Sequence, residues 1–328
     1  GQINGNQSDT KFGISQSFAL PVVYKRQKEV LKENYNSKIL ETNLKEFEVK
    51  RTVTQLFYNF LFLKEKQKLL QKADSLYGQF LEKANLRLKK GESNLLEKST
   101  AETQKTAIAM QLKQLKTEIE MNQLEFQLVL NSEENFVPFA SNFKAVLPEI
   151  KVEENPRIKY FAQQTKISEA ETALQKSRLW PEIIVGYNNN SFKGIGLDDA
   201  ARYHSAQVGL AVPLFGGSQK AKINASKIAE TVASATYSTA LLNLQTAQKK
   251  LQLQHQTNLE IVDYLETNST KNGQTIANLA YKQFTNGEIN YLDYVMLINQ
   301  SISIQNNYIE AVKSLNDSVI ALQFLFSN

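Results

Sequence analysis

The chain has no cysteine among its 328 residues and few residues that interrupt helices, with 13 glycines and 6 prolines. The absence of cysteine excludes disulfides, thiolate metal sites and thiol nucleophiles. Breakers are so sparse over this length that the sequence favours long helices over many short elements.

Long apolar runs are also missing, and so is any concentration of positive charge. No apolar run reaches the length of about 18 residues that a transmembrane helix needs. The net charge is +5, but the 38 basic residues are interleaved with 33 acidic ones. That pattern is typical of solvated helix faces, whereas a nucleic-acid interface would cluster its charge. We therefore expect no nucleic-acid partner.

Residues with the chemistry of an active site are scarce. His204 and His255 are the two histidines, and neither has a second ligand four residues away. The pair Gly216-Gly217 lacks the Lys-Ser/Thr that follows a phosphate-binding loop, so we expect it to turn a strand into a helix. The sequence predicts no catalytic residues, no metal site and no cofactor, and it indicates that the protein is not an enzyme.

What the chain does contain is an internal repeat. "GESNLLE" at residues 91–97 and "GEINYLD" at residues 287–293 share the pattern Gly-Glu-x-Asn-x-Leu-acid. Pro21 and Pro213, each at the end of an alternating stretch, are 192 residues apart, while Gly91 and Gly287 are 196 apart. We predict a first repeat over 1–131, a connector over 132–154 and a second repeat over 155–328.

Each repeat is expected to contain one very long helix before its glycine and a returning helix after it. In the first repeat, residues 22–90 and 92–131 have helical periodicity. Apolar residues recur in steps of three and four, which indicates an antiparallel coiled-coil hairpin that turns at the glycine. These seam residues are Val49, Val53, Leu56, Phe60, Leu63, Leu70, Ala73, Tyr77, Phe80 and Ala84. Asn155-Pro156 predicts the start of a further helix, which ends near Leu179.

Three stretches alternate with the period of a β-strand, at residues 12–20, 183–190 and 205–212. Each has one apolar face and one small or polar face. Two interpretations stay open: a membrane strand with a lipid face and a lumen face, or a small soluble sheet that caps a helical bundle. The fold class is mainly α with a small antiparallel β part, built from duplicated long helical hairpins.

The order of strand, proline, long helix, glycine break and return helix, found twice, resembles the TolC-like outer-membrane efflux factors. So do "VGLAVPLFGGSQKAKI" and "AYKQFTNGEINYLDYV", and the likeness is strongest over residues 155–328. The resemblance implies a homotrimer. Its strands would form a twelve-strand barrel in outer-membrane lipid, and its helices would form a tunnel across the periplasm.

The resemblance also implies the roles of particular residues. The glycine turns would be the periplasmic tips where an adaptor (membrane-fusion) protein of an inner-membrane pump docks. The predicted docking residues are Gly91, Glu92, Asn94, Gly287, Glu288 and Asn290. Asp293 matches the family's pore-constricting aspartate, whereas the second acid of the family, one turn later, is replaced by Met296.

Three further expectations concern the branch, the cargo and the extent of the chain. "DTKFGISQSFALPVVYKRQ" is most similar to the metal-efflux branch, which is sometimes fused to a pump. The cargo would be metal cations or small toxic compounds. The first repeat has no counterpart of residues 155–192, so we expect a chain truncated at its N-terminus. The alternative function is a periplasmic coiled-coil scaffold or adaptor that forms no channel.

Overall fold

The computed structural model describes residues 10–148, 155–192, 201–213 and 216–326, and most of them are helical. This confirms the predicted fold class. In chain order the elements are β1 (Thr10–Ala19), α1 (Pro21–Lys89), α2 (Leu95–Leu130), α3 (Pro156–Ser177), β2 (Glu182–Phe192), β3 (Ala201–Ala211), α4 (Gly217–Tyr264), η2 (Leu265–Ser269), α5 (Thr270–Asn286) and α6 (Tyr291–Phe326).

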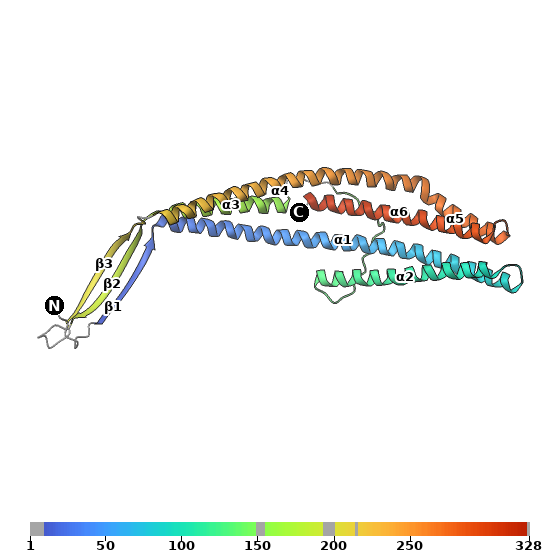
Figure 1. Cartoon of the computed structure of the whole chain (residues 1–328), viewed down its shortest axis with the longest axis horizontal. Helices are drawn as coiled ribbons and strands as arrows, with labels where there is room; N and C mark the ends of the chain where they lie inside the picture. Colours follow the sequence, from blue (N-terminus) through green and yellow to red (C-terminus); the bar gives the residue numbers. More distant parts are fainter. Residues whose placement is uncertain (1–9, 149–154, 193–200, 214–215, 327–328) are drawn as a thin grey trace. The chain divides into compact units, whose positions relative to one another are not determined.

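The chain forms two compact units, and each contains segments from both repeats. The first unit combines Gly1–Asn43 with Pro156–Leu242, and the second combines Leu44–Asn155 with Asn243–Asn328. Helices α1 and α4 each contribute to both units (Figure 1). The repeat boundaries proposed from the sequence stay a prediction.

The first unit contains a three-stranded antiparallel sheet in the order β1-β2-β3. Ile14 pairs with Tyr187, which in turn pairs with Ala206, so residues that pair across the strands share one face. The same holds for Phe18, Ile183 and Leu210. The register therefore aligns the three predicted apolar faces, and β3 begins at Ala201, four residues before its predicted start. The predicted exposed loop between β2 and β3 lies largely at 193–200, outside the described residues.

The second unit contains two helical hairpins, one of α1 with α2 and one of α5 with α6. The predicted seam of α1 is buried from Leu56 to Ala84, with Tyr77 and Ala84 fully inaccessible. Val49 is the exception, because 47% of it is exposed. Across the seam, Asn122 of α2 is buried and its amide nitrogen lies 3.4 Å from the Leu56 carbonyl oxygen. A buried polar residue in such a seam fixes the register of the two helices.

The long helix of the second repeat is not regular, contrary to the expectation of one uninterrupted α-helix before each glycine. A π-helical turn, η2, separates α4 from α5, and the chain bends there (Figure 1). The Thr270 hydroxyl donates to the Leu265 carbonyl at 2.9 Å within this turn. In α1 the corresponding stretch continues as α-helix through to Lys89.

The connector crosses the second hairpin beside the π-turn and is held there by side chains. Asn316 of α6 accepts from the Ala145 amide at 2.7 Å and donates to the Phe143 carbonyl at 2.7 Å. The Lys144 ammonium lies 3.0 Å from a Glu266 carboxylate oxygen, and the Tyr308 hydroxyl donates to that oxygen at 2.8 Å. The connector thus has a defined attachment to η2 and α6.

Among the helices that the structure describes, none has an apolar stretch of the length needed to cross a membrane.

Candidate functional site: the two hairpin turns

The two glycines of the repeated motif occupy the same backbone conformation. Gly91 has φ 74° and Gly287 has φ 77°, which is the left-handed region that side chains other than glycine rarely adopt. Each follows the last turn of a helix, and an added Cβ would meet no atom within 4 Å at either position. The glycines are therefore required by the backbone and not by crowding.

Both turns close with the same pair of hydrogen bonds, the Schellman arrangement that satisfies the last carbonyls of a helix. In the first turn, Gly91 N donates to Leu88 O at 3.1 Å and Glu92 N donates to Arg87 O at 2.9 Å. In the second, Gly287 N donates to Phe284 O at 3.2 Å and Glu288 N donates to Gln283 O at 2.9 Å.

The asparagines of the motif begin the returning helices. The Asn94 side-chain oxygen accepts from the Glu97 amide at 3.0 Å. The Asn290 oxygen accepts from the amides of Leu292 at 2.8 Å and Asp293 at 3.0 Å. These are N-cap interactions, which satisfy helix amides that have no intrahelical acceptor. Glycine and asparagine together account for the tight reversal.

The acids at the end of the motif occupy equivalent positions but different surroundings. Glu97 is 2% exposed, and its carboxylate lies 2.9 Å from the Arg87 guanidinium and also accepts a hydrogen bond from the Ser93 hydroxyl. Asp293 is only half-buried and accepts from the Asn290 amide nitrogen at 2.7 Å. Gln283 and Ile289 stand where the first turn has Arg87 and Ser93.

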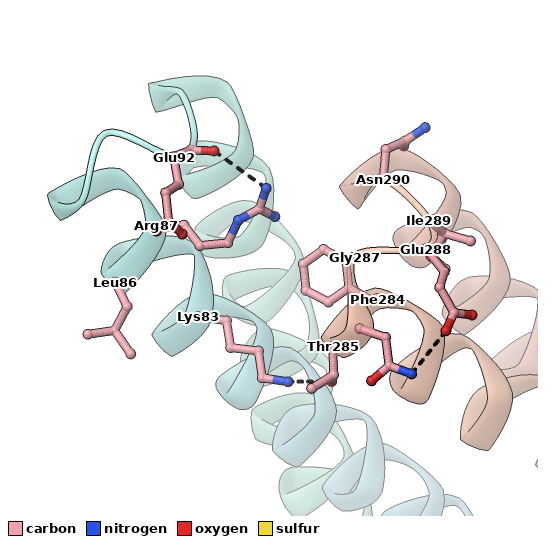
Figure 2. A pocket seen from close by; sticks show the side chains of 11 residues that line it. Lys83, Leu86, Arg87, Glu92, Phe284, Thr285, Gly287, Glu288, Ile289 and Asn290 are labelled. Carbon is pink, nitrogen blue, oxygen red and sulfur yellow. Dashed lines mark hydrogen bonds between the residues drawn. The ribbon is translucent and has the colours of Figure 1, made fainter.

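The two turns lie together at one end of the second unit, because residues from both line one open cavity of about 620 Å³ (Figure 2). The lining residues are Lys83, Leu86, Arg87, Glu92, Phe284, Thr285, Asn286, Gly287, Glu288, Ile289 and Asn290. The sequence-based expectation that both glycine turns share one end is confirmed. We call this cavity the tip groove.

A lysine crosses the tip groove from the first hairpin to the second. The Lys83 ammonium donates to the Thr285 hydroxyl at 2.5 Å (Figure 2). It also lies 4.4 Å from the centre of the Tyr281 ring. The ring face attracts the ammonium, so both contacts hold the hairpins at this spacing.

An aromatic cluster packs beside the tip groove, and one of its members, Phe284, lines the groove. The rings of Phe80, Phe284 and Tyr294 lie 4.6 to 5.4 Å apart between centres. Burial raises the pKa of Tyr294 to about 12, so its phenol is neutral at any physiological pH. Such packing joins α1, α5 and α6 into one core.

The structure therefore brings together most of the residues predicted for the tips. Glu92, Gly287, Glu288 and Asn290 line the groove, whereas Gly91 and Asn94 form the first turn without lining it. Sequence reasoning did not single out Lys83, Arg87 or Glu97. Glu97 could have been found, since it is the repeat partner of Asp293. The roles of Lys83 and Arg87 depend on helices that are distant in sequence.

The second acid expected near Asp293 is replaced by an exposed thioether. Met296 is 61% exposed and Leu292 is 58% exposed, one turn apart at the start of α6. The first hairpin has its own exposed leucine at the equivalent place, since Leu96 is 62% exposed. The leucine of the repeated motif is thus exposed in both hairpins.

Comparison with protein families gives one match, to the family described as outer membrane efflux protein, over residues 147–327. This stretch covers more than half of the chain and includes the second glycine turn. The chain belongs to the outer membrane efflux protein family. The match also falls on the repeat for which the sequence resemblance was strongest. Comparison with curated proteins found no significant match.

Solved structures match nearly the whole chain, including the first repeat. A membrane protein from Pseudomonas aeruginosa has a TM-score of 0.83 at 14% identity, covering 98% of this chain and 84% of its own. CusC, described as forming a transmembrane channel, has a TM-score of 0.82 at 15% identity, and the match covers 100% of this chain and 81% of CusC. The Campylobacter jejuni CmeC outer membrane channel has a TM-score of 0.79 at 15% identity, and the match covers 97% of this chain and 72% of CmeC.

At these identities the structural matches establish the fold, and the family model establishes the class of protein. Family membership places this outer membrane efflux protein in the outer membrane as a transport component. The metal-efflux branch is not singled out, because channels of several kinds match equally well.

Proposed function

We propose that the chain is one protomer of a homotrimeric efflux tunnel that passively exports substrate from an inner-membrane pump across the outer membrane. The observation that carries this proposal is the sheet, whose apolar face is bare. Phe12 is 65% exposed, Val208 78% and Leu210 70%. A soluble sheet would bury such a face, and among the described residues no helix covers it.

The sheet also has two open edges. Within the described strands, β1 and β3 each pair on one side only, with β2 between them. Unpaired backbone groups are not tolerated in lipid, so a membrane sheet must close on further strands. Additional copies of this chain supply them in our proposal. The opposite face, with Gly13, Ser15 and Gln207, would then line the water-filled lumen.

The helices support the same assembly. Helix α2 also has exposed apolar residues on the face opposite its buried seam. These residues are Met110, Met121, Leu124 and Leu128. Helix α4 has a similar exposed series that includes Ile228, Val232, Leu242 and Leu253. A further copy of the chain would cover both sets by coiled-coil packing.

We further propose that the hairpin turns dock a periplasmic adaptor. The exposed acids Glu92 and Glu288, the cap residues and the tip groove form one surface from both hairpins. The backbone there turns without side chains at Gly91 and Gly287, so a partner can approach the main chain closely.

Asp293 is proposed as the acid of the pore constriction, and cations are the cargo that such a ring favours. Its half-exposed carboxylate accepts a hydrogen bond from Asn290 and forms no ion pair with a described residue, so in our proposal it stays available to a passing ion. Metal cations are our first choice of substrate, in line with the N-terminal resemblance to the metal-efflux branch. Small toxic compounds are the alternative.

Conductance in planar lipid bilayers tests the tunnel, together with the oligomeric state of the purified protein. The wild type should run as a trimer and give cation-selective steps. Asp293→Ala should form the same trimer with less preference for cations. A monomer that never conducts would refute the tunnel, and a trimer whose selectivity ignores Asp293 would refute only the pore assignment.

A further inference from the structure

The exposed face of the sheet has polar side chains at one end of its strands, the end away from the connecting helices. The register pairs His204 with Asn189. Arg202 lies two residues before His204 in β3 and therefore on the same face. Ala206, Val208 and Leu210 continue that face in the other direction along β3. Arg202 thus stands just beyond His204, past the end of the apolar strip.

His204 is held in a defined orientation. Its Nδ1 lies 2.5 Å from the Tyr187 hydroxyl and 3.4 Å from the Asn189 amide nitrogen. The imidazole and phenol rings stack with centres 5.9 Å apart and planes at 30°. Hydroxyl and amide both donate, so we assign Nδ1 as the acceptor and place the ring proton on Nε2, where it is a donor.

Arginine at this position is notable in a chain that uses lysine almost everywhere. Only six of the 38 basic residues are arginines. A guanidinium offers two parallel N–H groups to a phosphate, whereas an ammonium acts as a point charge. Arg202 and the Nε2–H of His204 therefore offer hydrogen-bond donors on one face, at the boundary between apolar and polar surface.

We propose that Arg202 and His204 form a binding site for the phosphate of an anionic lipid headgroup. This inference rests on the proposed function, in which the bare face meets lipid. The helices that connect directly to the strands join the sheet at its other end, because β1 and β3 lead into α1 and α4 and β2 follows α3. With the helices in the periplasm, the Arg202 end lies at the outer leaflet, where phosphate groups are level with the end of the apolar strip.

The site can be tested by native mass spectrometry of the full chain, with phosphatidylglycerol and phosphatidylcholine added to the detergent. The wild type should retain phosphatidylglycerol in preference. Arg202→Gln should reduce that retention by about tenfold, the effect of one charge-assisted hydrogen bond. His204→Phe keeps a ring against Tyr187 and should cost about threefold. Arg202→Lys should fall between the wild type and the glutamine variant.

Lys11→Gln is the matched control, because Lys11 lies on β1 at the same end of the sheet but on the opposite face. It should retain phosphatidylglycerol as the wild type does. Equal retention by the wild type and Arg202→Gln would overturn the site, and so would an equal loss in Lys11→Gln. Displacement of the lipid by millimolar inorganic phosphate would overturn the lipid assignment in favour of a soluble phosphate site.

Conductance separates this inference from the proposed function. Arg202→Gln should insert and conduct as the wild type does. A conducting wild type with no headgroup preference would refute the lipid site alone, whereas a wild type that never inserts would refute the tunnel.

Discussion

The two hairpin turns share a motif and a backbone conformation but differ in what holds them. In the first turn, Glu97 is buried against Arg87 and Ser93. In the second, the Asp293 carboxylate accepts a hydrogen bond from the neighbouring Asn290 and stays half exposed. The comparison teaches that the same acid position can be buried in an ion pair or left half exposed, depending on the residues that stand where the first turn has Arg87 and Ser93.

The largest expected effect concerns the glycines, where the turns are alike. If the turns dock an adaptor as we propose, Gly287→Trp should abolish efflux in cells without breaking up the proposed trimer, because a bulky side chain enters open space at the proposed docking surface. Gly287→Asn is the control, since asparagine tolerates the left-handed region at little cost. It should retain most efflux, measured as survival on a toxic substrate. The same pair at Gly91 shows whether both turns dock, and full efflux in the Trp variants would exclude docking there.

Removal of Arg87 should affect stability far more than any change at Asp293. Arg87→Ala leaves the buried Glu97 without its cation, which should destabilise the first hairpin by about 2 to 3 kcal/mol. Asp293→Asn keeps the Asn290 cap and should cost less than about 1 kcal/mol. Urea unfolding of both variants tests the difference, and equal midpoints would show that the ion pair contributes nothing.

Two helical glycines extend the comparison to the body of the hairpins. An added Cβ at Gly273 would lie 3.0 Å from Ile304 Cγ2. Gly273→Val should therefore overpack the second hairpin and lower its free energy of unfolding by about 1 to 3 kcal/mol. At Gly78 the nearest atom would be 3.7 Å away, so Gly78→Ala should stabilise α1 by up to about 1 kcal/mol. The midpoints of thermal unfolding should therefore shift in opposite directions, and a midpoint that does not fall in Gly273→Val would refute the close packing of α5 on α6.

The smallest effect is expected at the connector, which contacts the second hairpin through Glu266. Burial by itself raises the pKa of Glu266. The Tyr308 hydroxyl and the Lys144 ammonium together lower it by more, so the pKa of Glu266 lies below the usual 4.5. A depressed pKa means that the contact stabilises at neutral pH and is lost as the pH falls below 4.5. Because Glu266 is partly exposed, the loss should stay below about 1 kcal/mol.

Hydrogen exchange of residues 143–147 measures this contact. Exchange should rise in acid, after correction for the intrinsic rate, and Glu266→Gln should show raised exchange at every pH. Glu260→Gln, on the exposed side of α4, is the control. Protection that does not change with pH in the wild type would mean that Asn316 alone holds the connector.

Much of this protein could be predicted from its sequence because the signals are local. Glycine needs its left-handed conformation, asparagine caps the next helix, and an apolar step of three and four residues requires a partner helix. The duplication, the helix bounds, the position of both turns and the two faces of each strand follow from these rules. Val49 was included in the seam wrongly, since the apolar periodicity continues to it although 47% of it is exposed.

Only the tertiary structure decided which acid is buried, where α4 is interrupted by a π-turn, and that Lys83 crosses from one hairpin to the other. The burial of Glu97 and the position of Lys83 depend on the side chain that stands opposite, which for Lys83 is Thr285, about two hundred residues away. A repeated motif specifies a turn by itself, but the charge and the exposure of its residues are set by the helices that pack beside it.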